Sequence, residues 1–141
     1  MRYHFMVHKD TDGFWAECCE LSGCKAQSDT EQGLEAECKE ALNLYLEEPG
    51  DSRIIFPLPD PSLSKDDTLL SVSVEPEIAL AVLLRHHRYV SKMTQKEVSD
   101  LLGMKNVYSY QRLEKKSNPS LRILKKIRSV FPDITFDYIF S

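Results

Sequence analysis

The chain lacks a long hydrophobic run. Its longest apolar stretch, residues 78–84, is far shorter than the roughly 20 residues that a membrane-spanning helix needs. The first seven residues contain neither the apolar segment nor the small-residue cleavage site of a secretory signal. The composition, 42% hydrophobic and 28% charged residues, is typical of ordinary globular proteins. We therefore expect a cytoplasmic protein that does not use a membrane.

The cysteine spacing that a metal site needs is also missing. The chain has four cysteines, Cys18, Cys19, Cys24 and Cys38, and none of them forms a Cys-x-x-Cys pair. Cys18 and Cys19 are adjacent, so their side chains would point to opposite faces of a strand. We expect four reduced thiols, partly in the core, and neither a metal nor a cofactor.

A catalytic constellation is not evident. A metal-dependent nuclease needs several carboxylates that converge on Mg²⁺. Asp10 and Asp12 are explained by turn chemistry, and His4 and His8 share a predicted strand face without a nucleophile or ligand spaced to join them. We predict no catalytic residues and no enzyme. A divergent RNA-processing enzyme, dependent on Asp10 or Asp12, is the more distant alternative.

Charge divides the chain into two parts. Residues 1–77 contain 6 Lys/Arg and 17 Asp/Glu, a net charge of −11, whereas residues 78–141 contain 12 and 5, a net charge of +7. An acidic unit repels phosphate and can attract a basic partner, while a basic unit attracts phosphate. The simplest interpretation is an adaptor, in which one half contacts nucleic acid and the other contacts a positively charged partner.

The first half shows the period of two that is typical of half-buried strands. Residues 3–7 predict a strand, Asp12-Gly13 predicts a tight turn, and residues 14–18 predict the returning strand of a hairpin. A short third strand is predicted over residues 24–27 and a fourth over residues 70–74.

One helix is predicted between the third and fourth strands. Ser28 and Glu31 stand at capping-box spacing, and Pro49-Gly50 ends the helical pattern. Its apolar face consists of Leu34, Cys38, Ala41, Leu42 and Tyr45. Residues 1–76 are therefore predicted to form a small α+β domain with one helix on one face of a sheet.

From Ile78 onward the periodicity is helical. Helices are predicted over residues 78–87, 94–102, 106–115 and 121–130, so that residues 77–141 form an all-α domain. Thr94 and Glu97 form a capping box, Gly103 ends the second helix and Asn106 caps the third. The apolar tail over residues 134–140 is expected to be a short strand or a packed terminal arm.

Several spaced elements of the second half resemble the Cro/repressor-like (XRE) helix-turn-helix family. They are Met93 to Gly103, Tyr110-Gln111-Arg112-Leu113-Glu114, Asn118-Pro119-Ser120-Leu121, and Arg85 near the end of the first helix. The resemblance covers about residues 78–130. The stretch from Gly103 to Leu113-Glu114 is one residue longer than the family spacing.

This resemblance implies a DNA-binding surface. It places Val107, Tyr108 and Arg112 at base-reading positions in the major groove, and Thr94, Gln95 and Ser109 near phosphates. Asn106, as the cap of the reading helix, belongs to the same surface. Attraction to the DNA backbone would come from Lys92, Lys96, Lys105, Lys115 and Lys116.

The first half resembles the N-terminal domain of HicB-type antitoxins. The matching elements are residues 3–7, Asp12 to Glu17, Leu21-Ser22-Gly23-Cys24, Asp29-Thr30 and the helix over residues 34–46. The resemblance implies a small, partial RNase H-like β-β-β-α-β fold followed by a DNA-binding domain. Cys19-Glu20 departs from the pattern, since family members often have a proline there.

Together the two resemblances imply an antitoxin of a type II toxin-antitoxin system. Such a protein binds a small basic, HicA-like toxin that cleaves mRNA, and represses its own operon by binding double-stranded operator DNA. We expect Asp12, Trp15 and Glu17 to face the toxin; for Trp15 the alternative is a core aromatic. Repressors of this kind read two half-sites, so we expect a homodimer or higher homo-oligomer, to which residues 131–140 could contribute. The alternative function is a stand-alone transcriptional regulator whose N-terminal domain senses a ligand or another protein.

Overall fold

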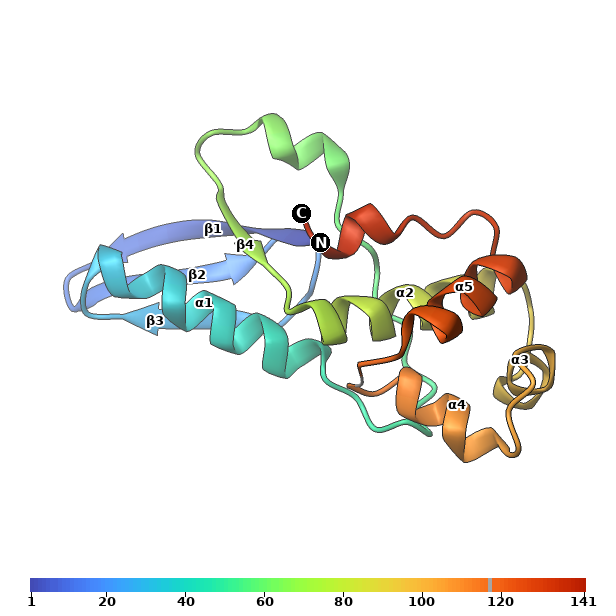
Figure 1. The fold of residues 1–141 in the computed structure, drawn as a ribbon. Coiled ribbons are helices and arrows are strands. Elements are labelled where there is room, and N and C mark those ends of the chain that lie inside the picture. Colours follow the sequence, from blue (N-terminus) through green and yellow to red (C-terminus); the bar gives the residue numbers. More distant parts are fainter. Residues whose placement is uncertain (117) are drawn as a thin grey trace.

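A computed structural model describes residues 1–116 and 118–141 of the chain. It is an α+β structure in which a four-stranded antiparallel sheet precedes a helical half (Figure 1). The order of the predicted elements along the chain is confirmed.

The sheet consists of β1 (Arg2–Asp10), β2 (Gly13–Cys18), β3 (Lys25–Ser28) and β4 (Leu70–Ser73), in the spatial order β3-β2-β1-β4. The predicted hairpin between β1 and β2 is confirmed. Its turn contains Gly13 at φ +143°, a conformation that L side chains rarely adopt. The register pairs Phe5 with Cys18 and Tyr3 with Val72, which places alternate apolar residues on one face.

Helix α1 (Glu31–Leu46) covers that apolar face (Figure 1). Leu34, Cys38 and Leu42 on its inner side are buried, as the helical period predicts. The predicted capping box of Ser28 and Glu31 is wrong. The N-cap is Thr30, whose Oγ1 accepts from the Gly33 N–H at 3.0 Å. The chain is still extended at Ser28, the last residue of β3, and the Ser28 hydroxyl accepts from the Thr30 N–H instead.

The helical half contains α2 (Pro76–Val90), α3 (Gln95–Leu101), α4 (Val107–Leu113) and α5 (Leu121–Val130). Helix α2 is its centre, because every residue from Ile78 to Arg85 is buried. The capping box of Thr94 and Glu97 and the cap by Asn106 are both confirmed. None of the helices in the described part of the chain is long and apolar enough to cross a membrane.

The tail forms a packed arm, and the alternative of a short strand is wrong. It ends in a short 3-10 helix, η2 (Phe136–Ile139), that returns to α2. The two chain ends meet there, since the Met1 ammonium group donates to the Tyr138 carbonyl (Figure 1). The sequence predicts that residues 131–140 contribute to a dimer interface. Phe131, Ile134 and Ile139 are buried within the chain, and Phe140 is the apolar side chain of this tail that is mostly exposed.

The two halves share one hydrophobic core. A continuous cluster of buried side chains runs from Tyr3 and Phe5 in the sheet, through Leu42 in α1, to Leu84 in α2 and Ile127 in α5. A core of this size is out of reach for either half alone, since small units bury a smaller fraction of their surface. Whether the proposed boundary near residue 76 separates two domains therefore stays a prediction.

Within the helical half, His87 at the end of α2 contributes a pH dependence to stability. Its ring packs against Phe131 with 6.0 Å between the ring centroids. Burial lowers the pKa of His87 below the ordinary value of 6.5, and the neighbouring His86 adds to this effect. The unfolded chain therefore binds more protons than the folded chain as the pH falls through about 6.5, so this group destabilises the fold on acidification.

We predict that His87→Gln loses less unfolding free energy than the wild type when the pH is lowered from about 7 to about 5. Urea titrations at each pH measure the difference. Equal losses in the two proteins would contradict the assignment.

Candidate DNA and partner interfaces

Helices α3 and α4 form a compact pair joined by a short turn. Val98 on α3 and Tyr110 and Leu113 on α4 are buried. The turn passes through Gly103 at φ +70°. The Ser99 hydroxyl on α3 donates to the carbonyl of Asn106, the N-cap of α4, at 2.9 Å, and this hydrogen bond links the two ends of the turn.

A buried carboxylate fixes the pair onto α2. Glu114, directly after α4, is fully buried. Arg88 donates to both of its oxygens, from Nε at 2.7 Å and from Nη2 at 3.0 Å. Arg85 lies 4.0 Å from the carboxylate and donates from Nε to the Glu114 carbonyl at 2.9 Å. Gln95 adds a third donor at 3.1 Å. We call these four residues, Arg85, Arg88, Gln95 and Glu114, the polar hub.

The two arginines of the hub keep their charges. Burial lowers the pKa of Arg85, whose ordinary value is so high that it stays protonated. Burial acts on Arg88 in the same direction, but its hydrogen bonds with Glu114 outweigh this and raise its pKa. Sequence reasoning identified Arg85 and Glu114 only as elements of a pattern and missed Arg88. The helical spacing of Arg85 and Arg88, three residues apart on a buried helix, is the signal that could have found the pair.

The residues predicted to contact DNA fall into two groups. Thr94, Lys105, Asn106, Tyr108, Arg112 and Lys115 are exposed, whereas Gln95, Val107 and Ser109 are half-buried. Thr94 and Asn106 use their side-chain oxygens as caps, at 3.1 Å from the Glu97 N–H and 3.1 Å from the Ser109 N–H. Within the described residues, the side chains of Tyr108 and Arg112 make neither a hydrogen bond nor a salt bridge, so they are available to a ligand.

Gln95 is committed inside the protein. Its amide nitrogen donates to the Gly50 carbonyl at 2.7 Å and to Glu114, and its oxygen accepts from Gln111 Nε2 at 3.0 Å. The prediction that Gln95 lies near phosphate stays a prediction, and this internal role was missed from the sequence.

The lysines predicted to attract DNA are not equivalent. Lys116 forms a salt bridge with Glu75 at 3.4 Å, and Lys96 one with Asp100 at 3.5 Å. Within the described residues, Lys105 and Lys115 do not form a salt bridge. Four further exposed cations were not singled out from the sequence; they lie on α5 and are Arg122, Lys125, Lys126 and Arg128.

In the first half, the sheet face opposite α1 carries an exposed cross-strand cluster. The register places His8 beside Trp15, and their rings stack with centroids 4.1 Å apart. His8 Nε2 lies 3.1 Å from Glu17 Oε1, and Lys25 Nζ lies 5.9 Å from the Trp15 ring. Trp15 is half-buried and does not belong to the core, so the alternative of a core aromatic is wrong.

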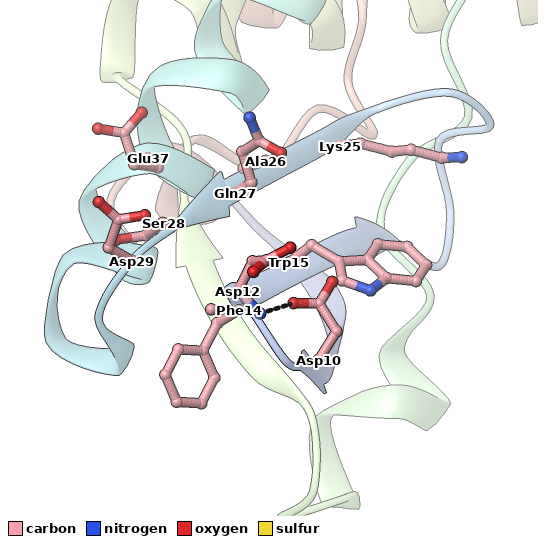
Figure 2. Close-up of a pocket in the computed structure, with 11 residues that line it drawn as sticks. Asp10, Asp12, Phe14, Trp15, Lys25, Ala26, Gln27, Ser28, Asp29 and Glu37 are labelled. Atoms are coloured by element: carbon pink, nitrogen blue, oxygen red, sulfur yellow. Dashed lines mark hydrogen bonds between the residues drawn. The ribbon is translucent and has the colours of Figure 1, made fainter.

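An open hollow of about 1050 Å³ lies at the hairpin end of this half. Figure 2 shows Trp15 and Asp12 on one side of it and Asp29 and Glu37 on the other. Asp10 Oδ1 accepts from the Asp12 N–H at 3.0 Å, so the predicted turn chemistry is confirmed. Of the three residues predicted to face a toxin, Asp12 and Trp15 line the hollow, whereas Glu17 lies further along the sheet.

Three of the four cysteines are small buried residues. Cys18, Cys24 and Cys38 are buried, Cys19 is exposed, and all four are free thiols. Its hydrogen bond to Cys24 and burial both raise the pKa of Cys18, and burial raises the pKa of Cys38 to about 11. Within residues 1–116 and 118–141, no group of three or more His, Cys, Asp or Glu side chains is arranged to hold a metal ion.

Comparison with known proteins gives little direct information. No family model matches the chain, and no curated protein matches it. Among solved structures, the crystal structure of antitoxin HicB3 is similar, with 23% sequence identity and a TM-score of 0.44. The similarity covers 54% of this chain and 63% of that one, which is less than two thirds of its length.

The polar hub makes a direct prediction about stability. Glu114→Ala leaves the buried Arg85 and the half-buried Arg88 without their carboxylate, so the free energy of unfolding is expected to fall by about 3–5 kcal/mol. The matched control is Asp100→Ala, which removes an exposed partner of Lys96 and is expected to cost about 0.5 kcal/mol or less. Urea unfolding measures both. Similar losses in the two variants would show that the hub is not the stronger interaction.

Proposed function

We propose that this protein is a DNA-binding antitoxin. In this proposal the basic half binds operator DNA and represses transcription, and the acidic half binds and blocks a small basic, HicA-like toxin. Both activities are binding functions without a chemical step. One observation carries the proposal: a pair of helices held by buried contacts exposes Tyr108 and Arg112 in the basic half of a molecule whose other half is strongly acidic.

Support for DNA binding comes from how α4 is held. The polar hub and the buried contacts of Val98, Tyr110 and Leu113 orient α4 on α2 and α3. Base readout in the major groove needs such a fixed helix, because a bidentate contact from Arg to guanine tolerates little displacement. Arg112 is the proposed guanine reader, and Tyr108 and Val107 contact neighbouring bases. Lys105 and Lys115, at the two ends of α4, contribute attraction to the backbone.

Helix pairs of this kind read two half-sites as dimers, so we propose that the protein acts as a homodimer or a higher homo-oligomer. The exposed apolar side chains available for such an interface in the described residues include Tyr89 and Val90 at the end of α2 and Phe140.

Support for toxin binding comes from charge and shape in the acidic half. Trp15 offers a half-exposed aromatic ring beside Asp12, and Asp29 and Glu37 line the same hollow (Figure 2). Aromatic side chains of this kind dominate the energetics of protein interfaces, and opposite charge accelerates the encounter of two proteins. A basic protein is therefore the partner that fits this half best.

The hollow also supports the alternative function, a stand-alone regulator that senses a ligand in its first half. The two functions differ in one cheap observation. An antitoxin co-purifies with the product of a neighbouring gene for a small basic protein, whereas a ligand sensor does not.

Arg112→Ala is expected to weaken operator binding by about 1–3 kcal/mol, or roughly 5- to 150-fold in Kd, because one bidentate base contact is lost. Gel-shift titrations on the upstream region of the gene measure this. The matched control is Lys39→Ala, which removes an exposed cation from α1, and binding of the toxin is expected to survive both changes. Equal loss of DNA and toxin binding in Arg112→Ala would mean that Arg112 is structural.

Trp15→Ala is expected to weaken the toxin complex by more than about tenfold, the loss typical of a central aromatic contact. The control is Leu44→Ala, which removes a 70% exposed apolar side chain from the outer side of α1. Calorimetric titration with the co-expressed toxin measures both, and DNA binding should not change. The proposed toxin face is wrong if Leu44→Ala weakens the complex and Trp15→Ala does not.

A further inference from the structure

Residues 47–53, which follow α1, are docked against the helix pair of the other half. Figure 1 shows this segment running from the end of α1 past α4 before it returns beneath α2. Arg85 donates from Nη2 to the Pro49 carbonyl at 2.6 Å and from Nη1 to the Ser52 carbonyl at 2.7 Å. The Gly50 carbonyl accepts from Gln95 at 2.7 Å. All three contacts use backbone carbonyls, so they do not depend on the side chains of the segment.

The backbone of the segment lies close to α4 at Gly50. A Cβ atom built on Gly50 would lie 2.7 Å from the Gln111 carbonyl oxygen, a distance that real Cβ atoms do not show. Only glycine fits at this point of the docked segment. Any larger residue must push the segment away from α4.

When the segment is docked, the side-chain amide of Gln95 is already engaged and is not free to donate to a DNA phosphate. The amide nitrogen of a glutamine carries two hydrogens. In Gln95 one is directed to the Gly50 carbonyl and the other to Glu114, 3.1 Å away. A phosphate oxygen can therefore accept from Gln95 only if it displaces Gly50 or the buried hub carboxylate, and Gly50 is the more accessible of the two.

The segment also brings negative charge to this place. It contains Glu47, Glu48 and Asp51 against a single Arg53. None of the three carboxylates forms a salt bridge within the described residues. Glu48 and Asp51 flank the docked Pro49 and Gly50, so two carboxylates without a salt bridge lie next to the helices proposed to approach phosphate, and Glu48 acts on the charge of Arg85 from a longer distance. The carboxylates and the DNA phosphates are both negative and would repel each other, and salt screens this repulsion.

We propose that residues 47–53 are an intramolecular competitor of DNA: when docked, the Gly50 carbonyl occupies Gln95 and the carboxylates of Glu48 and Asp51 repel the backbone phosphates. The segment thus lowers the affinity of the basic half for any duplex. This inference rests on the proposed DNA binding and concerns its regulation by the chain itself.

The test is fluorescence anisotropy of a labelled duplex of the upstream region, and of a random-sequence duplex, between roughly 0.05 and 0.3 M salt. The double variant Glu48→Gln, Asp51→Asn is expected to bind both duplexes about fivefold more tightly at the lowest salt, with the gain shrinking as salt rises. The matched control is Asp67→Asn, an exposed carboxylate of the acidic half for which no hydrogen bond or salt bridge is found within the described residues.

Gly50→Ala tests the docking itself. It is expected to tighten binding as well, because displacement of the segment frees Gln95 and also moves the carboxylates of Glu48 and Asp51, so that only part of the gain is lost at high salt. A thermal melt checks that the variant is folded, and if it is not, the carboxylate variant decides alone.

The outcomes are distinct. An unchanged or weaker affinity of the carboxylate variant overturns the inference, and so does an equal gain in Asp67→Asn, which would indicate a general charge effect. If neither the wild type nor any variant binds a duplex at dilute salt, the proposed DNA-binding function fails, and the inference fails with it. Tight wild-type binding without a gain in the variants overturns the inference alone.

Discussion

Glu114 is a carboxylate without solvent exposure, and a buried charge is stable only when it is paired and hydrogen-bonded. Arg88 satisfies both of its oxygens, and Gln95 provides a further donor. The three groups come from α2, from α3 and from the end of α4. The requirement to satisfy one buried charge therefore fixes three helices relative to one another, a geometric constraint that apolar packing alone leaves looser.

The same hub extends to the acidic half through Arg85 and Gln95. Their remaining donors are directed to Pro49, Ser52 and Gly50, in the segment that follows α1. Helix α1 in turn packs on the sheet and carries Glu37 at the hollow. The surface proposed for a basic partner and the surface proposed for DNA are thus joined by one helix and one docked segment. The two surfaces differ in the sign of their charge, and the halves that carry them are connected by these hydrogen bonds.

Local patterns of the sequence predicted most of the fold. Alternation at Tyr3, Phe5 and Val7 and the pairing of Thr94 with Glu97 depend only on neighbouring residues, so the strands and α3 could be predicted directly. The start of α1 was misplaced because Ser28 and Thr30 are both competent caps, and only the length of β3 decides between them.

Contacts between distant residues could not be predicted in the same way. Glu114 and Arg85 are 29 positions apart, and residues 47–53 show only the pattern of a helix end. The outward position of Trp15 is an intermediate case, since the turn at Gly13 sets the hairpin register that pairs Trp15 with His8 on the open face.

We infer that the hub and the shared core unite two oppositely charged halves into one cooperative structure. In differential scanning calorimetry of the full chain, we therefore expect a single transition whose calorimetric enthalpy equals its van't Hoff enthalpy. Two resolved transitions, one for each half, would contradict it.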